Sequence, residues 1–458
     1  MISDWKIKNM QFIFDIINLA WISISNNFVA IFTFAIPLGI FIYIFINKRA
    51  VTSQKSLSSY INVKNAGLTE PASLHPIIDP NLCVGCASCI NACPERDVLG
   101  LINNRAHLIN PTHCIGHGAC KLSCPMDAIA LVFGTAKRGI DIPVLKPNFE
   151  TNIPGMYISG ELGGMGLIRN ATEQGRQAMD SIKKAIPNIQ GPPIDVVIIG
   201  AGPSGFSATL SAHEAKLNYV TVEQDSLGGS VFNFPRGKVV MTQPAELPIV
   251  GKVKINETTK EALLGFWQAI EQKTGIKINY KERMEMITPT DSGMIIKTTK
   301  AEYHTKTVLL AIGRRGTPRK LGTPGEDKAK VVYSLIDSQQ YQNMNVLVVG
   351  GGNSALEAAC SIAEEPGTTV TLSYRSGAFS RAAEKNRENI AKLEAEGRIT
   401  VMLKSNVKEI KDNSVVISYK DDLVEIPNQG VIVSAGGILP TPFLKKIGIQ
   451  VETKHGTL

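Results

Sequence analysis

The chain has 458 residues, which at roughly 150 residues per domain predicts about three domains with ample apolar core. Hydrophobic residues make up 44% and charged residues 19%, a composition that excludes a disordered polymer. Lys and Arg number 48 against 40 Asp and Glu, and the net charge of +8 is spread without a basic block. The charge pattern therefore indicates no nucleic-acid partner.

An uncharged stretch near the start predicts a membrane span. Residues Ile16–Ile46 contain no charged side chain, and Phe28–Ile46 is apolar or nearly so. As a helix, residues 28–46 would measure roughly 28 Å, about the hydrocarbon thickness of a bilayer. Pro37 is compatible with a kinked membrane helix. The run is too long for a signal peptide and no small-residue cleavage pattern follows, so we expect a retained single-pass anchor.

The flanks of this span predict its orientation. Residues 1–27 hold an apolar stretch with tryptophans near its ends, which favours an interfacial segment over a second span. Lys48 and Arg49 follow the span, which favours an inner (cytoplasmic) membrane location with a cytoplasmic globular part. Residues 47–75 are polar without a pattern and predict a linker.

The cysteines predict iron–sulfur chemistry. Eight cysteines are too few for a disulfide scaffold of this length, and all except Cys360 lie between Cys83 and Cys124. The first run has the spacing C-x2-C-x2-C-x3-C-P, in which three thiolates wrap one cluster and the fourth points to another. Zinc motifs do not use three successive cysteines and a closing Cys-Pro. The run consists of Cys83, Cys86, Cys89 and Cys93.

A second copy of the motif follows, with His117 in place of the second cysteine. Residues 76–135 thereby resemble the bacterial two-cluster ferredoxins, which are small α+β domains. The resemblance implies a crossover between the two motifs. Cluster one would take Cys83, Cys86, Cys89 and Cys124, and cluster two would take Cys93, Cys114 and Cys120.

His117 leaves three alternatives open. It could ligate the fourth iron of a second [4Fe–4S] cluster, as histidine does in other iron–sulfur centres. It could stand beside a [3Fe–4S] cluster, which needs no ligand at this position. The second cluster could also be vestigial.

A buried strand from Val196 leads into the first G-x-G-x-x-G sequence and then into a helical stretch. A second strand ends at Glu223, whose carboxylate is suited to ribose hydroxyls. Glycines permit the tight turn and the close approach of a pyrophosphate to the helix N-terminus. The candidate residues are Gly200, Gly202, Pro203, Ser204, Gly205 and Glu223.

The pattern recurs with an arginine where the acid would stand. Strand 370–374 is followed by Arg375, with Arg381 six residues on, and guanidinium groups suit a 2′-phosphate. The second fingerprint therefore favours NADPH over NADH, unless both arginines are only solvated surface charges. The glycine-rich candidates are Gly350, Gly352, Asn353, Ser354 and Ala355.

Together these motifs resemble the flavoproteins with two dinucleotide-binding domains, closest to the thioredoxin-reductase-like branch. The resemblance implies an α/β fold with two Rossmann-like domains, FAD at the first fingerprint, NADPH at the second, and a homodimer. It assigns residues 191–320 to the FAD domain, 321–435 to the NADPH domain, and 436–458 to a return into the FAD domain. It adds Gly229, Gly313 and Gly436 as cofactor-binding candidates.

One departure from that family is the order of its parts. The segment that binds the ribityl chain and presents a helix to the flavin does not follow the NADPH domain. Its counterpart lies upstream, in residues 136–190, which predicts a circular permutation. Glu161 stands where the family has Asp. The candidates in this segment are Gly160, Glu161, Asn170 and Ala171.

A second departure is the missing redox disulfide. Neither residues 331–341 nor residues 226–233 contain the cysteine pair that the two disulfide-reductase branches carry there. Cys360 stands alone on the apolar side of a predicted helix and is interpreted as a core residue. Thiol–disulfide exchange therefore has no cysteine pair outside the cluster motifs.

The leading interpretation is a membrane-anchored oxidoreductase that passes electrons from NADPH through FAD and iron–sulfur clusters to a one-electron or membrane acceptor. No side chain need act as an acid or base, since the cofactors carry the reaction. The redox partner would be a cytochrome, a quinone-reactive subunit or a ferredoxin. The alternatives are NADP⁺ reduction driven by ferredoxin or quinol, and an electron-transfer subunit active only within a membrane complex.

Overall fold

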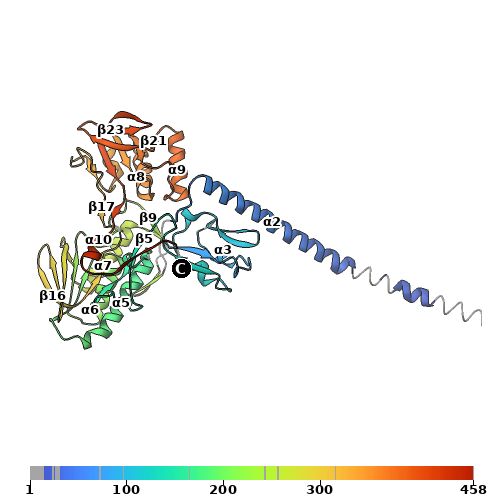
Figure 1. Ribbon diagram of the computed structural model, residues 1–458, viewed down its shortest axis with the longest axis horizontal. Coiled ribbons are helices and arrows are strands. Elements are labelled where there is room, and N and C mark those ends of the chain that lie inside the picture. Colours follow the sequence, from blue (N-terminus) through green and yellow to red (C-terminus); the bar gives the residue numbers. More distant parts are fainter. Residues whose placement is uncertain are drawn as a thin grey trace, which may run out of the picture.

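The structure, a computed structural model, describes residues 15–22, 25, 31–71, 74–95, 97–164, 166–241, 244–254, 257–314 and 316–456. It consists of three lobes and one long helix that runs along one lobe and projects beyond it (Figure 1). Residues 15–22 are helical, and the rest of the predicted interfacial segment lies almost wholly outside the described residues.

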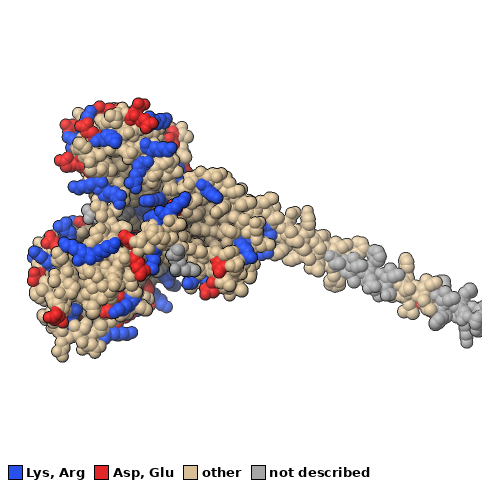
Figure 2. All heavy atoms as spheres, in the orientation of Figure 1, with Lys and Arg blue, Asp and Glu red and all other residues tan. Residues whose placement is uncertain are grey.

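The long helix, α2 (Ile36–Asn65), follows a π-helical turn at Ile31–Ala35. Pro37 has no backbone N–H to donate to the preceding turn, and a π-turn is a common irregularity at such a place. Phe32–Asn65 is long and apolar enough to cross a membrane by length and composition. The predicted span begins at residue 28, outside the described residues. The projecting part of α2 carries almost no charged side chains, unlike the lobes (Figure 2).

The linker predicted over residues 47–75 is wrong for its first two thirds, because α2 continues to Asn65. Ser53, Ser56 and Ser59 lie three residues apart and therefore share one helix face. The Ser53 hydroxyl accepts from the Asn103 amide at 3.1 Å, and the Ser59 hydroxyl from the Asn110 side chain at 3.4 Å. A polar contact face of this kind has no apolar periodicity, so the sequence pattern did not reveal it.

The first lobe, here called the cluster module, contains two short sheets and two short helices. Strand β1 (His75–Ile78) pairs antiparallel with β4 (Ile129–Val132), and β2 (Leu99–Ile102) forms a hairpin with β3 (Arg105–Leu108). The helices are α3 (Ser88–Ala92) and α4 (Ala119–Leu122). Their core combines Leu99, Leu101 and Ile129 with the buried thiols of Cys89 and Cys114.

The second lobe, the FAD-type lobe, has the sheet order β13-β8-β7-β16-β15-β14. Strand β6 pairs with the last residues of β16, on the edge opposite β7. Strands β6, β7, β8 and β16 are parallel, and their side chains are buried on both faces, as expected of a parallel sheet covered by helices. The strands are β6 (Met156–Ile158), β7 (Ile194–Ile199), β8 (Tyr219–Glu223), β13 (Asn279–Tyr280), β14 (Met284–Thr290), β15 (Gly293–Thr298) and β16 (Glu302–Leu310). The helices are α5 (Ile168–Ala185), α6 (Pro203–Glu214) and α7 (Lys260–Thr274).

The third lobe, the NADPH-type lobe, has the parallel sheet order β18-β25-β19-β20-β21. A three-stranded antiparallel sheet, β22-β23-β24, packs beside it. The parallel strands are β18 (Val331–Val332), β19 (Asn345–Val349), β20 (Thr369–Tyr374), β21 (Ile399–Leu403) and β25 (Gly430–Val433). The other elements are α8 (Asn353–Ala363), α9 (Glu384–Ala395), β22 (Asn406–Ile410), β23 (Ser414–Tyr419) and β24 (Asp422–Pro427).

The last described residues return to the FAD-type lobe. Strand β17 (Thr317–Pro318) crosses between the lobes beside β26 (Gly437–Ile438). Helix α10 (Thr441–Lys446) then leads to β27 (Val451–Lys454), which pairs antiparallel with β5 (Ile140–Pro143). Leu444 packs in the same core as Met156. The expected combination of two Rossmann-type domains and a ferredoxin-like domain is confirmed.

Candidate functional site

The structure gathers the four residues predicted for cluster one around a single cavity. This cavity, called cavity one, is lined by Cys83, Cys86, Cys89 and Cys124. The amides of Ala106 and Ala128 donate to the sulfurs of Cys83 and Cys124 at 3.4 and 3.3 Å. Thiols fixed by N–H···S bonds around an apolar cavity fit an iron–sulfur cluster.

A second cavity collects the other four residues. This second cavity, called cavity two, is lined by Cys93, Cys114, His117 and Cys120. His117 therefore stands beside the three cysteines, as its place in the repeat predicts. Within the described residues, no three His, Cys, Asp or Glu side chains converge as a single-ion site.

Glycine holds the binding loop of cavity one in its conformation. Gly85 has φ +68°, and a Cβ on it would lie 2.0 Å from the Asn104 carbonyl oxygen.

Burial raises the pKa of the Cys89 and Cys114 thiols to about 11. Burial also lowers the pKa of His117, which leaves its imidazole neutral near pH 7.

The residues of one strand give the order of the two cavities. Ile129 of β4 lines cavity one, and Leu131 of the same strand lines cavity two. Phe133 follows β4. Its ring packs on Gly164, since a Cβ added to Gly164 would lie 2.8 Å from the ring. Gly164 closes η3 (Gly160–Gly163), which contains Glu161 of the predicted flavin segment. Because each residue of a strand advances about 3.3 Å, cavity two lies between cavity one and the FAD-type lobe.

The first fingerprint forms the turn between β7 and α6. Gly200 has φ +104°, and a Cβ on Gly205 would lie 1.7 Å from the Gly200 carbonyl oxygen, so side chains are sterically excluded there. Gly202 is the N-cap of α6 with no side-chain cap, and Pro203 occupies the first turn, followed by buried Ser204. This leaves the helix N-terminus lined by backbone, which suits a phosphate.

Glu223 reaches the first fingerprint from the end of β8. Its carboxylate accepts from the amides of Ala201 at 2.7 Å and Asp225 at 2.9 Å, and the side chain is buried. Burial raises the pKa of Glu223, and the two amide bonds partly offset that rise. Gly229 lies directly against the same turn, because a Cβ on it would meet the Gly202 Cα at 3.1 Å. The backbones of Gly202 and Gly229 are thus in direct contact, which leaves no room for a side chain at Gly229.

The upstream segment lies beside the same helix N-terminus. The hydroxyls of Ser159 and Ser204 are 2.7 Å apart, and the Gly160 amide donates to the Gln174 side chain at 2.9 Å. Gly175 of α5 packs on α6, since a Cβ there would lie 2.1 Å from the Ser204 carbonyl oxygen. The structure thus brings residues 159–175 together with the first fingerprint, although the two segments are separate in sequence.

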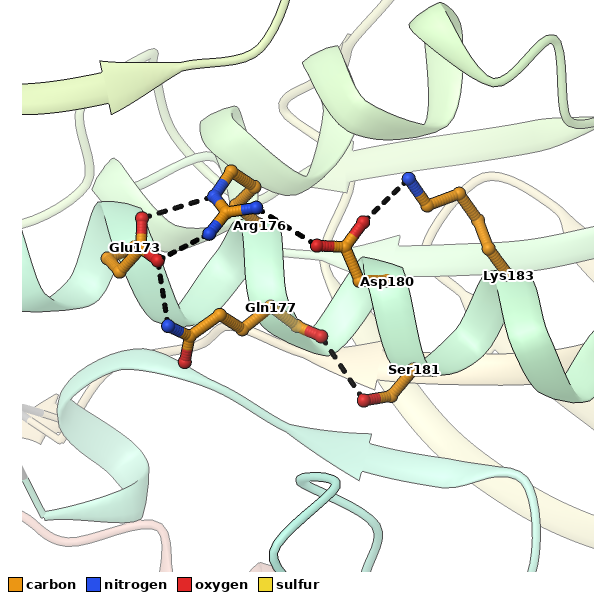
Figure 3. A network of polar contacts seen from close by, with 6 residues as sticks. All are labelled: Glu173, Arg176, Gln177, Asp180, Ser181 and Lys183. Atoms are coloured by element: carbon orange, nitrogen blue, oxygen red, sulfur yellow. Dashed lines mark hydrogen bonds and ion pairs between the residues drawn. The ribbon is translucent and has the colours of Figure 1, made fainter. Parts of the chain in front are cut away.

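Helix α5 presents the other flavin candidates in its first turn. Ala171 is buried and Asn170 half-buried. On the exposed face of the helix, Arg176 bridges Glu173 at 2.6 Å and Asp180 at 3.0 Å (Figure 3). The hydrogen bond from Arg176 lowers the pKa of Glu173. Such i,i+3 and i,i+4 pairs support the helix that carries Asn170.

The second fingerprint repeats the geometry at the end of β19. Gly350 has φ +148°, and a Cβ on it would lie 2.4 Å from the Ser434 carbonyl oxygen. Gly352 is the N-cap of α8, and Ala355 is fully buried in the following turn, which also contains Ser354. The Asn353 carboxamide accepts from the Ala383 amide at 2.6 Å, which holds α9 against the fingerprint. Gly313 and Gly436 follow β16 and β25 at the corresponding edges of the two sheets.

The two predicted arginines are exposed, and two unforeseen arginines lie near one of them. The backbone of Arg381 pairs with Gly352, which places it beside the fingerprint. The two unforeseen arginines are Arg138, which follows the cluster module, and Arg314 of the FAD-type lobe. Burial lowers the pKa of Arg138, and the positive charges of Arg381 and Arg314 lower it further. Basic side chains gather around the hollow between the lobes (Figure 2). Arg375 directly follows β20.

Sequence reasoning also missed the contact between the cluster module and the NADPH-type lobe. His113 lies 3.2 Å from the Glu384 carboxylate at the start of α9. Arg387 of the same helix donates to the Thr112 hydroxyl at 3.5 Å. The residue after His113 is Cys114 of cavity two, so this cavity lies next to both flavoprotein lobes. Contacts between lobes leave no local signal in sequence.

Comparison with known proteins agrees with this architecture. Residues 197–458, more than half of the chain, match the family described as pyridine nucleotide-disulphide oxidoreductase, and residues 75–125 match a 4Fe-4S dicluster domain. Similar proteins include bacilliredoxin reductase Bdr of Bacillus subtilis, 27% identical over 57% of this chain and 82% of the relative. The ferredoxin–NADP reductase of Ignicoccus hospitalis is also 27% identical, over 57% of this chain and 83% of the relative.

A solved structure supports the fold alone. Bacillithiol disulfide reductase Bdr from Staphylococcus aureus has a TM-score of 0.50 at 24% identity, covering 56% of this chain and 80% of that protein.

The two family matches show that the chain belongs to the pyridine nucleotide-disulphide oxidoreductase family and carries a 4Fe-4S domain in addition. It is an NAD(P)H-dependent flavin and iron–sulfur oxidoreductase.

Proposed function

We propose that the protein is a membrane-anchored oxidoreductase that conducts electrons from NADPH, by way of two iron–sulfur clusters, to an acceptor at the membrane. The observation that carries this proposal is the order along β4, where Ile129 lines cavity one, Leu131 lines cavity two and Phe133 packs at Gly164 of the flavin segment. When bound, FAD exchanges electron pairs with a nicotinamide and single electrons with iron–sulfur clusters. The chain's own residues would fix the cofactors in this order.

The ligand assignments follow the cavities. Cluster one would be held by Cys83, Cys86, Cys89 and Cys124, and cluster two by Cys93, Cys114, Cys120 and His117. Of the three alternatives for His117, its position on the wall of cavity two beside the cysteines favours the ligand role. The first fingerprint with Glu223 and the segment from Gly160 to Ala171 would hold FAD, and the second fingerprint with Arg375 and Arg381 would hold NADPH.

A circular permutation would account for the order of the flavin-binding parts. The segment from β5 to α5 precedes β7 in sequence, yet β6 completes the sheet on β16. The last described strand, β27, pairs with β5, so the end of the NADPH-lobe return lies where the transposed segment begins. Joining β27 to β5 and opening the chain before β7 would restore the order of a protein with this segment at its C-terminus.

The membrane anchor is supported by exposed apolar surface. In α2, Phe41, Tyr43 and Ile46 each expose 60% or more of their surface. A continuous apolar surface of this length costs considerable free energy in water and marks a membrane contact. We infer that this helix crosses the inner membrane once, with the three lobes on the cytoplasmic side.

Disulfide reduction is not part of this proposal. All eight cysteines are free, and seven of them line the two cavities. Cys360 packs half-buried against the core of the NADPH-type lobe, and burial raises the pKa of its thiol to about 11. A lone protonated thiol cannot form the intramolecular disulfide that the reaction requires.

The test is anaerobic reduction of the full chain in detergent. Adding NADPH should bleach the flavin absorption and produce the electron paramagnetic resonance signals of reduced clusters. Cys89→Ser should remove one of these signals, whereas the matched control Cys360→Ser should keep both. Flavin bleaching without any cluster signal would contradict the proposed electron route.

The reverse direction is a second candidate, because relatives with this domain are named ferredoxin–NADP reductases. The same preparation decides between the two directions. Chemically reduced protein mixed with NADP⁺ should form NADPH if the reverse reaction is the favoured one. Comparing this rate with the rate from NADPH to a one-electron acceptor gives the preferred direction.

A further inference from the structure

The end of the apolar helix segment is tied to the loop of cavity one. The Arg49 guanidinium donates to the Gly85 carbonyl at 3.1 Å, and it lies 5.0 Å from the centre of the Phe45 ring. Helical side chains lean toward the N-terminus, so this guanidinium points back along α2 toward the apolar part. The loop from Cys83 to Cys86 is therefore level with the last turn of the apolar segment.

The other contacts between α2 and the cluster module lie progressively farther along the helix. Ser53 contacts Asn103, Ser56 lies against Gly100, and Ser59 contacts Asn110. With a rise of about 1.5 Å per residue, the Ser59 contact is roughly 15 Å farther from the apolar segment than the Arg49 contact. Cavity one, which Gly85 lines, thus lies at the end of the module nearer the apolar segment of α2.

The tip of this end is apolar and exposed. Leu82 is 47% exposed, Val84 60% and Met126 46%, and the last two line cavity one. Exposed Arg105 donates to the Cys83 carbonyl at 3.0 Å and exposed Lys48 precedes Arg49 on the helix, so two basic side chains flank the tip beside one acid, Asp127. Apolar side chains bordered by Lys and Arg match the boundary between acyl chains and anionic headgroups.

We propose that Leu82, Val84 and Met126 contact the lipid surface, so that cluster one is held at the membrane boundary as the terminal centre. The inference rests on the proposed anchoring of α2. The occupant is the bilayer itself, because the tip is fixed to the helix that enters it. A soluble acceptor would find this tip covered, whereas a carrier dissolved in the membrane would reach it.

The experiment uses the full chain in vesicles of phosphatidylethanolamine and phosphatidylglycerol brominated near the headgroup. Val84→Trp adds an emitter at the tip, and Leu82→Trp is a second variant in case the first fails to fold. Leu423→Trp, at a position 71% exposed on the NADPH-type lobe, is the matched control. Vesicles are floated first, and the emission of the wild-type tryptophans is subtracted.

Bromine should quench the added emission of Val84→Trp and Leu82→Trp severalfold more than that of Leu423→Trp. Equal quenching in protein that floats would overturn the lipid contact while leaving the anchor intact. Shielding of Val84→Trp in native membranes but not in these vesicles would identify a membrane protein as the occupant and overturn the proposal. Protein that does not float would refute the anchor and the contact together. NADPH-dependent bleaching, measured on the same samples, reports on the proposed function separately.

Discussion

At the scale of single residues, the differences from a simple motif carry the most information. His117 interrupts a cysteine repeat, yet its side chain lines the same cavity as Cys93, Cys114 and Cys120. Arg375 stands where an acid would favour NADH, and Arg381 lies beside the same fingerprint. We expect each of these side chains to change a chemical preference rather than the fold, so each can be tested by substitution.

His117 should decide the composition of the second cluster. If it ligates, anaerobically purified wild type should contain about eight irons in two [4Fe–4S] clusters. His117→Cys should keep that count and lower one reduction potential, because a neutral imidazole is replaced by an anionic thiolate. His117→Ala should give about seven irons and a [3Fe–4S] signal.

The control for this prediction is His107→Ala, which changes an exposed histidine of the same module and should leave the iron content unaltered. A wild type that already has the lower iron count and the [3Fe–4S] signal, both unaffected by His117→Ala, would make this histidine a bystander. Iron analysis and paramagnetic resonance of the purified proteins provide the measurement.

Arg375 and Arg381 should set the nucleotide preference. Replacing both with Ala should weaken NADPH binding far more than NADH binding, because two charge-assisted contacts of about 1.5–3 kcal/mol each would be lost. The ratio of kcat/KM values for the two nucleotides should then fall by about two to four orders of magnitude. Lys392→Ala, on the exposed face of α9, is the control and should leave the ratio unchanged. An unaltered ratio in the arginine double variant would assign both residues to the solvated surface.

At the scale of elements, the contact of α5 with α6 joins the two parts of the proposed flavin site. The contact is close because Gly175 has no side chain, and the Ser204 carbonyl occupies the space where one would stand. The outer face of α5 carries the ion-pair network around Arg176, which is solvent-accessible and contributes little stability. Packing, rather than surface charge, therefore positions Asn170 and Ala171.

Gly175→Ala tests this packing. The new methyl group should force the two helices apart, destabilise the protein by about 1–3 kcal/mol and reduce the FAD retained on purification. Gly265→Ala on α7 is the matched control, because nothing lies within 4 Å of its added Cβ. That substitution should stabilise the protein by about 0.5–1 kcal/mol, since alanine is the better helix former. Thermal unfolding and flavin content report both effects, and equal stability in the two variants would refute the argument.

The same scale shows what the sequence could and could not predict. Cysteine spacing and glycine fingerprints specify local geometry, so the partition of Cys89 and Cys93 between two cavities was predictable. The continuation of α2 through Ser56 was not predictable, because the side chains that face the cluster module there are polar and leave no apolar periodicity. The pairing of His113 with Glu384 likewise arises only when the lobes come together.

At the scale of the whole molecule, the cluster module contacts both flavoprotein lobes and the long helix α2. The NADPH-type lobe contacts the cluster module through α9, and the FAD-type lobe contacts it through Phe133. The cluster module in turn rests on α2. The cluster module borders the proposed FAD site, and the upstream segment from β5 to α5 forms part of that site. Both are therefore expected to take part in electron transfer.

Truncation tests the dependence of the proposed flavin site on the upstream segment, residues 136–190. A chain beginning at Ile194 keeps Gly200, Gly202, Gly205 and Glu223 but loses β6 and α5, and with them the Ser159–Ser204 contact and the packing on Gly175. It should therefore purify without flavin. A chain beginning at Ala136 lacks the cluster module but retains β5, β6 and α5, so it should bind FAD in equal proportion to protein. Flavin released by heat and measured against protein concentration compares the two. Stoichiometric FAD in the shorter chain would refute the permutation, because the first fingerprint alone would then suffice.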